Sequence, residues 1–262
     1  MSSLATRHEP PRAPGIHALP AEELNELRFA LVRAEPGSAH QFHTGDSEAV
    51  LVVLESAGGS VTVEGERFEL PDRDSVFASP PSGVYAPPSA PVSVNGPLLA
   101  GVFMARANGD APSAYAVMPE DVQSVERGSG NFRREVRDIV TADRPASRLL
   151  VGETINPPGN WSSSPPHKHD RHAPPEEAEL EEIYLYRVDP GQGFGIQMSY
   201  SSDPPEELAF PVHDLDVVAI PRGYHPVVAG PGYSLYYLWG LAGRGRELLW
   251  NPDPDHAWVD VS

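Results

Sequence analysis

Hydrophobic and polar positions alternate over short stretches along the first half of this chain, which is the pattern of β-strands. Leu27–Ala34 alternates in this way, whereas Ala49–Leu54 is apolar throughout, which indicates a strand buried on both faces. Glycine, proline and aspartate separate the runs, and Glu64-Gly65 marks the tip of a hairpin. The strands expected in this half are Leu27–Ala34, Ala49–Leu54, Ser60–Glu64, Arg67–Leu70, Ser75–Ala78, Gly83–Ala86, Pro91–Val94 and Leu98–Ala105.

The second half continues the same pattern, and helices should be few and short because no segment keeps an apolar period of 3.6 residues. The best helical candidate is Pro20–Leu27, where early acidic residues precede spaced leucines. Met1–Pro20 is proline-rich and unpatterned, which predicts a flexible leader with one possible strand near Ile16. The later strands are expected at Phe132–Val140, Arg148–Asn156, Glu182–Arg187, Gly193–Tyr200, Glu207–Val212, Asp216–Ile220, His225–Ala229 and Tyr233–Leu241.

A polar segment at Ala107–Gly130 is the best linker candidate between these two sets of strands. Each half has a hydrophobic run, a glycine hairpin, an aspartate before an apolar strand and a proline turn. We therefore predict an all-β protein made of two tandem barrels with few short helices. The expected domains are residues 1–128 and residues 129–262.

The bulk composition narrows the class of function. The 262 residues carry a net charge of -18 with no basic cluster, which argues against nucleic-acid binding and against attachment to an anionic membrane. The absence of cysteine excludes disulfides, thiolate metal ligands and cysteine nucleophiles. Because there is neither an apolar signal sequence nor an apolar run of about 18 residues, we expect a cytoplasmic protein.

Candidate metal ligands are concentrated in the second half. His167 and His169 share one face of an extended segment because strand side chains alternate with a period of two. Glu182 begins the next β-like run, and His225 follows a Pro/Gly turn after an apolar strand. Three imidazoles and one carboxylate suit Zn, Mn, Fe, Co or Ni. Glu182 is preferred over its acidic neighbours because Glu181 would point to the opposite face.

The first half offers no comparable set of ligands. Its only histidines at a corresponding place, His40 and His43, lie three residues apart and have neither a matching glutamate nor a later histidine. We interpret both as structural, so the metal site is expected in the second barrel alone.

A barrel with these ligands resembles the cupin superfamily, and its duplication resembles a bicupin. More specifically, the second half is similar almost continuously to the 5-deoxy-glucuronate isomerase family of myo-inositol catabolism, while the first half agrees in plan and length. Ser164 departs from the family pattern, in which a tyrosine is expected. The resemblance is carried by residues 159–163, 165–170, 180–184, 193–195, 221–226, 232–238 and 255–259.

This resemblance implies a metal-dependent aldose–ketose isomerase that converts 5-deoxy-glucuronate to 5-dehydro-2-deoxy-gluconate. Such chemistry moves a proton between adjacent carbons and needs a general base. The candidate catalytic residues are Glu181, His172, His213 and Tyr184. Arg222 or Lys168 would bind the carboxylate of the sugar acid.

Other functions remain open at this point. A cupin dioxygenase also uses three histidines and one glutamate around iron, and oxygen consumption would distinguish it from an isomerase. A sugar-binding or regulatory cupin would bind its ligand without turnover. No helix-turn-helix accompanies the barrel, which argues against a transcription factor. Exposed barrel edges and proline-rich arms are compatible with a homodimer.

Overall fold

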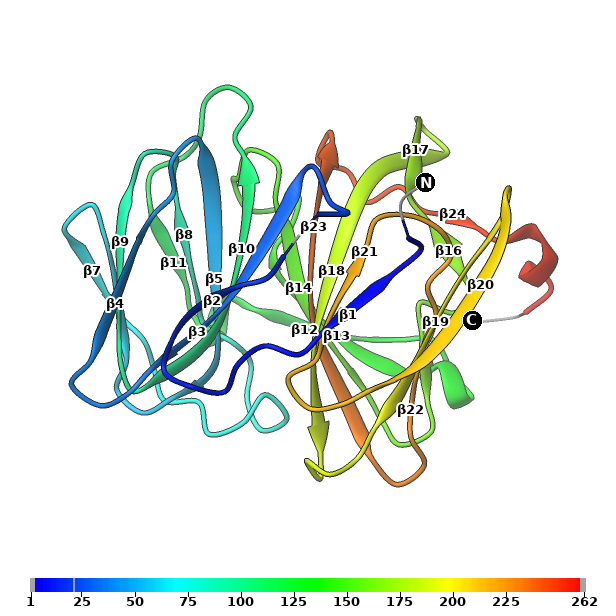
Figure 1. The fold of residues 1–262 in the computed structure, drawn as a ribbon, viewed down its shortest axis with the longest axis horizontal. Coiled ribbons are helices and arrows are strands. Elements are labelled where there is room, and N and C mark those ends of the chain that lie inside the picture. The colour runs from blue at the N-terminus through cyan, green and yellow to red at the C-terminus, as the bar shows by residue number, and fades with distance from the viewer. Residues whose placement is uncertain (1–2, 21, 260–262) are drawn as a thin grey trace.

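The computed structural model describes residues 3–20 and 22–259, which form two β lobes side by side (Figure 1). In the first lobe a six-stranded sheet faces a four-stranded sheet. The six-stranded sheet has the order β11 (Tyr115–Val117), β8 (Gly83–Ala86), β5 (Ser47–Ser56), β10 (Leu98–Arg106), β3 (Leu27–Ala34) and β2 (Gly15–Ala18). The four-stranded sheet has the order β4 (Ala39–His43), β9 (Pro91–Asn95), β6 (Ser60–Val63) and β7 (Glu66–Glu69).

The second lobe is a larger barrel built around an eight-stranded sheet. That sheet has the order β1 (Thr6–His8), β21 (Val217–Ile220), β18 (Glu177–Asp189), β23 (Ser234–Arg244), β14 (Leu150–Asn156), β13 (Arg134–Val140) and β12 (Gln123–Arg127), and β17 (Asp170–Ala173) also pairs with β18. The facing sheet has the order β15 (Trp161–Ser162), β22 (Val227–Ala229), β19 (Gly195–Ser202) and β20 (Pro205–Val212), and β16 (His167–Lys168) pairs with β24 (Asn251–Pro252).

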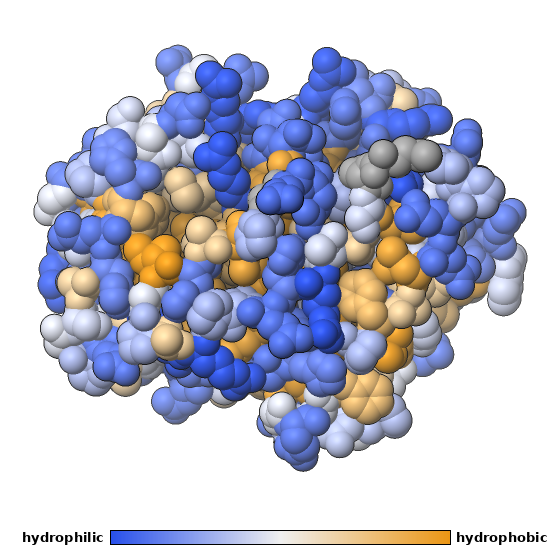
Figure 2. Space-filling view, viewed as in Figure 1, coloured by the Kyte–Doolittle hydropathy of each residue, from blue (hydrophilic) through white to orange (hydrophobic). Residues whose placement is uncertain are grey.

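The prediction of an all-β protein with two tandem barrels is confirmed. Helical structure in the described residues consists of short 3-10 turns at Pro119–Asp121, Gly130–Phe132 and Pro254–His256. None of these is long or apolar enough to cross a membrane. The face seen in Figure 2 is mostly hydrophilic, with hydrophobic residues in small groups.

Three hydrophobic cores organise the molecule: one inside each barrel and one between the two lobes. The strand β5 contributes to two of them. Its Val50, Val52 and Leu54 pack in the core between the lobes, whereas Leu51 and Val53 pack inside the first barrel. Both faces of β5 are therefore buried, which explains its continuous apolar sequence.

Reciprocal polar contacts also join the lobes. The buried Glu48 of the first lobe accepts hydrogen bonds from the backbone N–H groups of residues 147–149, at 2.6 to 2.7 Å. Glu181 of the second lobe accepts hydrogen bonds from the backbone N–H groups of residues 25–27, at 2.8 to 3.1 Å. Each lobe thus binds three consecutive amides of the other through one carboxylate.

Two predicted elements are wrong. The expected helix at Pro20–Leu27 is replaced by turns and bends over residues 22–26, with Ala21 outside the described residues. The backbone N–H groups of Glu26 and Leu27, which would form hydrogen bonds within a helix, donate instead to the carboxylate of Glu181. The expected strand Ser75–Ala78 is a turn, because Arg73 donates to the carbonyl oxygens of Val76 and Ser79 and holds this segment against the lobe.

The predicted flexible leader is also wrong for residues 3–20, while Met1 and Ser2 lie outside the described residues. β2 confirms the possible strand near Ile16 and pairs with β3. β1 crosses to the second lobe and pairs antiparallel with β21. The proposed linker also carries strands: β11 pairs with β8 of the first lobe and β12 pairs with β13 of the second. The division into residues 1–128 and 129–262 stays a prediction.

Candidate metal centre

Three side chains converge inside the second barrel and could hold a metal ion. His169 follows β16, Glu182 lies on β18, and His225 lies in the loop after Gly223. One ligand atom from each lies within 4.8 Å of the others, and all three residues are buried. Gly223 has a φ of +85°, so the turn that delivers His225 uses a backbone conformation that favours glycine.

The alternation of β18 decides which glutamate enters the barrel. Ile183 and Leu185 pack in the core between the lobes, whereas Tyr184 and Tyr186 pack inside the second barrel. Because strand side chains alternate between faces, Glu182 shares the face of the two tyrosines. Glu181 takes the opposite face and contacts the first lobe.

Backbone carbonyls fix the orientation of both histidines. Nδ1 of His169 lies 2.9 Å from the carbonyl oxygen of Leu180, and Nδ1 of His225 lies 2.9 Å from that of Gly223. A carbonyl only accepts, so each Nδ1 carries the proton in the neutral ring, and each Nε2 presents a lone pair. These Nε2 atoms lie 3.2 Å and 3.1 Å from the same Glu182 Oε2. Three acceptors at this spacing require a shared cation, either a proton or a metal ion.

The electrostatics of the group fit metal ligation. Burial alone would raise the pKa of Glu182, but the neighbouring His169 and His225 lower it to about 2. Burial alone would lower the pKa of His169, whereas the hydrogen bond and charge of Glu182 raise it. His225 Nε2 is buried and makes no aligned hydrogen bond within the described part of the chain. A divalent ion would satisfy this atom and would displace any proton on His169.

His167, the other predicted ligand, lies beside this group rather than in it. Its ring centroid is 5.2 Å from that of His225, 6.3 Å from that of His169, and 5.3 Å from that of Trp250. Burial, together with His225 and His169, lowers the pKa of His167 to about 3, so the ring is neutral near pH 7. Neutral imidazole is the form that binds metal.

Tyr184 is the one catalytic candidate that the structure places beside the buried group. Its ring centroid lies 6.1 Å from that of His225, and its hydroxyl lies 3.1 Å from Ser163 Oγ. Burial raises the pKa of Tyr184 well above the usual value of 10. The phenol therefore keeps its proton at neutral pH.

The remaining predicted residues lie outside the barrel interior. Glu181 faces the first lobe, and His172 is exposed on β17. His213 is exposed and lies 3.5 Å from Asp216. Lys168 Nζ contacts Asp170 and lies 2.9 Å from Glu177, and Arg222 Nη2 lies 2.5 Å from Glu206.

Sequence reasoning missed the polar side chains that line the barrel interior. Tyr237 Oη and Asn156 Nδ2 both donate to Ser162 Oγ, at 2.8 Å and 2.9 Å. Asn156 Oδ1 and Ser199 Oγ are buried and make no hydrogen bond to any residue that the structure describes. The available signal was the strand alternation itself, which puts these polar residues at inward positions where an apolar side chain is usual.

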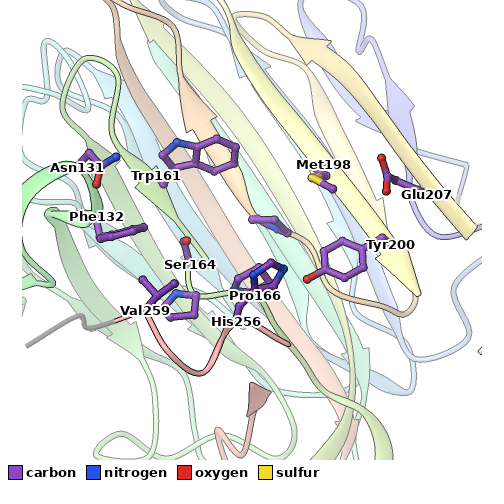
Figure 3. Close-up of a pocket in the computed structure, with 12 residues that line it drawn as sticks. Asn131, Phe132, Trp161, Ser164, Pro166, Met198, Tyr200, Glu207, His256 and Val259 are labelled. Carbon is purple, nitrogen blue, oxygen red and sulfur yellow. The ribbon is translucent and has the colours of Figure 1, made fainter. Parts of the chain in front are cut away.

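A separate groove of about 440 Å³ lies outside the barrel wall (Figure 3). Trp161, Met198 and Tyr200 line it, and they alternate along β15 and β19 with the buried Ser162, Gln197 and Ser199. The groove therefore lies on the outer face of the four-stranded sheet that contains β15 and β19. Its other lining residues are Asn131, Phe132, Ser164, Pro165, Pro166, Glu207, Pro226, His256 and Val259.

Solved structures share this architecture. An IolB-like protein from Salmonella typhimurium LT2 superposes with a TM-score of 0.91 at 29% identity, over 98% of this chain and 99% of that one. Oxalate decarboxylase from Lactobacillus farciminis superposes with a TM-score of 0.66 at 13% identity, over 99% of this chain and 95% of that one. The second likeness concerns the fold alone and agrees with the bicupin architecture expected from the sequence.

Curated relatives match over most of the chain. The 5-deoxy-glucuronate isomerase of Geobacillus thermodenitrificans is 39% identical over 235 residues, which cover 88% of this chain and 85% of the relative. That of Bacillus subtilis strain 168 is 33% identical over 243 residues, which cover 90% and 89%. The sequence profile of the KduI/IolB family matches residues 12–259. This chain therefore belongs to the KduI/IolB family.

Proposed function

We propose that the protein is a metal-dependent aldose–ketose isomerase that converts 5-deoxy-glucuronate to 5-dehydro-2-deoxy-gluconate. The observation that carries this proposal is the buried group of His169, Glu182 and His225, in a chain 33 to 40% identical to curated 5-deoxy-glucuronate isomerases. The polar lining of the barrel supports a hydroxylated substrate, because sugar hydroxyls would pair with the free Asn156 and Ser199 oxygens.

In this proposal His169, Glu182 and His225 hold a divalent ion, and His167 completes the ligand set. The ion is Zn, Mn, Fe, Co or Ni, and when bound it supplies a Lewis acid that polarises the substrate carbonyl. Glu182 contributes the single anionic ligand. The carbonyls of Leu180 and Gly223 keep the two buried imidazoles in the tautomer that ligation requires.

The protonated hydroxyl of Tyr184 would donate a hydrogen bond to a reacting oxygen of the substrate. An aldose–ketose isomerisation moves one proton between two carbons and another between their oxygens. Because burial keeps the phenol protonated, Tyr184 suits donation of a hydrogen bond to the oxygen on which negative charge develops. Ser163, at 3.1 Å, orients the hydroxyl.

Turnover of 5-deoxy-glucuronate, followed by proton NMR on protein incubated with each of the five metals, tests the function. The expected result is formation of the 2-deoxy-5-keto acid, abolished by a chelator and restored by metal. Oxygen consumption instead of isomerisation would indicate a dioxygenase. Sugar binding without product, from folded and metal-loaded protein, would indicate a binding protein.

Two finer predictions accompany this function: a cytoplasmic location and a homodimer. The lack of cysteine is compatible with a reducing compartment. The homodimer is tested by light scattering, in which a mass near 28.3 kDa would contradict it.

A further inference from the structure

Arg134 occupies a position in the second barrel that the sequence did not single out. It begins β13, where Glu135 pairs with Ile155 and Val136 pairs with Thr154 of β14. Val136 packs against the core of the second barrel, whereas Arg137 faces the other lobe and contacts Glu153. The alternation of β13 therefore puts Arg134 on the barrel side of the sheet, on the strand next to Asn156.

Within residues 3–20 and 22–259, the guanidinium of Arg134 has no anionic partner. Its Nη1 donates to the carbonyl oxygen of Phe132 at 3.2 Å, and among the described residues no carboxylate oxygen lies within 4.0 Å of it. Lys168 and Arg222, by contrast, are each paired with carboxylates. A half-buried cation without a counter-ion has an unfavourable desolvation free energy, which an anionic ligand would offset.

The electrostatic surroundings agree with this placement. Burial lowers the pKa of Arg134, whereas the nearby Tyr237 and Tyr184 act in the opposite direction. Both tyrosines pack in the core of the second barrel, on the side of the sheet where strand alternation puts Arg134.

We propose that Arg134 binds the carboxylate of the sugar-acid substrate. This rests on the proposed function, since the substrate's reacting end then lies at His169, Glu182 and His225. The hydroxyl groups between the two ends would contact Asn156 and Ser199, whose buried oxygens make no hydrogen bond among the described residues. A cation at this position would also offset the net charge of -18 locally when an anionic substrate binds.

The test compares Arg134→Gln with Arg134→Lys and with Arg133→Gln as a matched control. Arg133 is the adjacent arginine, is exposed, and pairs with Glu126 at 3.2 Å. In turnover of 5-deoxy-glucuronate, Arg134→Gln should raise KM about 10- to 100-fold and change kcat by less than about 3-fold. Arg134→Lys should recover part of the loss, and Arg133→Gln should behave as wild type.

A binding measurement separates this inference from the proposed function. Calorimetry on metal-loaded protein compares glucuronate with its neutral amide, glucuronamide. Wild type should prefer the acid by at least about 10-fold, and Arg134→Gln should lose that preference while its melting temperature stays near wild type. Absence of turnover in wild type with this preference intact would reject the isomerase and leave the Arg134 site standing. A wild type without the preference, or an Arg134→Gln variant that keeps it or loses affinity for both sugars equally, would overturn the inference.

Discussion

Two consecutive glutamates show how a single backbone position decides a side chain's role. Glu182 points into the second barrel and contacts His169 and His225, whereas Glu181 points to the first lobe and binds the amides of residues 25–27. The residues are chemically the same, and only the face of β18 distinguishes them. Substitution by glutamine should therefore reduce metal affinity at position 182 and reduce stability at position 181.

Replacing Glu182 should weaken metal binding. Glu182→Gln removes the only anionic member of the group, and we expect at least a 10-fold loss of affinity for Zn. Inductively coupled plasma mass spectrometry after dialysis measures the bound metal. Wild-type metal content in Glu182→Gln would contradict this assignment.

Replacing Glu181 should instead weaken the structure. Glu181→Gln exchanges a charge-assisted set of amide contacts for a neutral acceptor, so we expect the free energy of unfolding to fall by about 1 kcal/mol with metal content unchanged. Urea unfolding with the metal assay measures both quantities. Loss of metal from this variant would show that the two faces are not independent.

The candidate metal ligands could be predicted from the sequence because the patterns that indicate them are local. His169, Glu182 and His225 follow recognisable strand and turn patterns, and alternation alone separates Glu182 from Glu181. Arg134 could not be found in this way, because an arginine at the start of a strand reads as a solvent-facing cation. Its position depends on the pairing of β13 with β14, which no local pattern specifies.

At the scale of elements, β1 is the feature that local reasoning missed. The first residues look like a proline-rich leader, yet Thr6–His8 pair with β21 of the second lobe, and Leu4 is fully buried. Leu4 also packs close to Gly223, in the turn that delivers His225. The same limit explains the missing helix at Pro20–Leu27, since a distant carboxylate overrides the local acid and leucine spacing.

Truncating Leu4 should destabilise the protein although it lies far from the buried ligands in sequence. Leu4→Ala removes a fully buried side chain, so we expect a loss of about 2 to 5 kcal/mol in the free energy of unfolding. Glu9→Ala, at an exposed position of the same arm, should change it by less than about 0.5 kcal/mol. Equal urea midpoints for the two variants would mean that the arm is not docked in solution.

At the scale of the whole molecule, the two lobes share a core and a buried ionic cluster. Glu153 is fully buried and lies 2.8 Å from Arg73 of the first lobe and 2.8 Å from Arg137 of the second. Tyr236 donates a further hydrogen bond to it at 2.8 Å. The lobes should therefore unfold together.

Removing the central carboxylate should destabilise both lobes at once. Glu153→Ala leaves the buried guanidinium of Arg73 without its anion and leaves Arg137 with Glu135 alone, so we expect a loss of about 3 to 5 kcal/mol. Glu126→Ala, which breaks the exposed pair with Arg133, should cost less than about 1 kcal/mol. Fluorescence and circular dichroism should give one coincident urea transition in each variant, and two separate transitions would indicate independent lobes.

The pairing of β1 with β21 also constrains how the protein is made. Thr6 pairs with Ala219, so the ribosome must add roughly 210 residues after β1 before its partner strand exists. During that interval Leu4 and the edge of β1 lack the strand against which they pack in the folded protein. The first barrel, by contrast, can already assemble around β3, β5 and β10. The metal-ligand barrel is thus completed only after β21 has been made, when it pairs with β1, a strand synthesised much earlier.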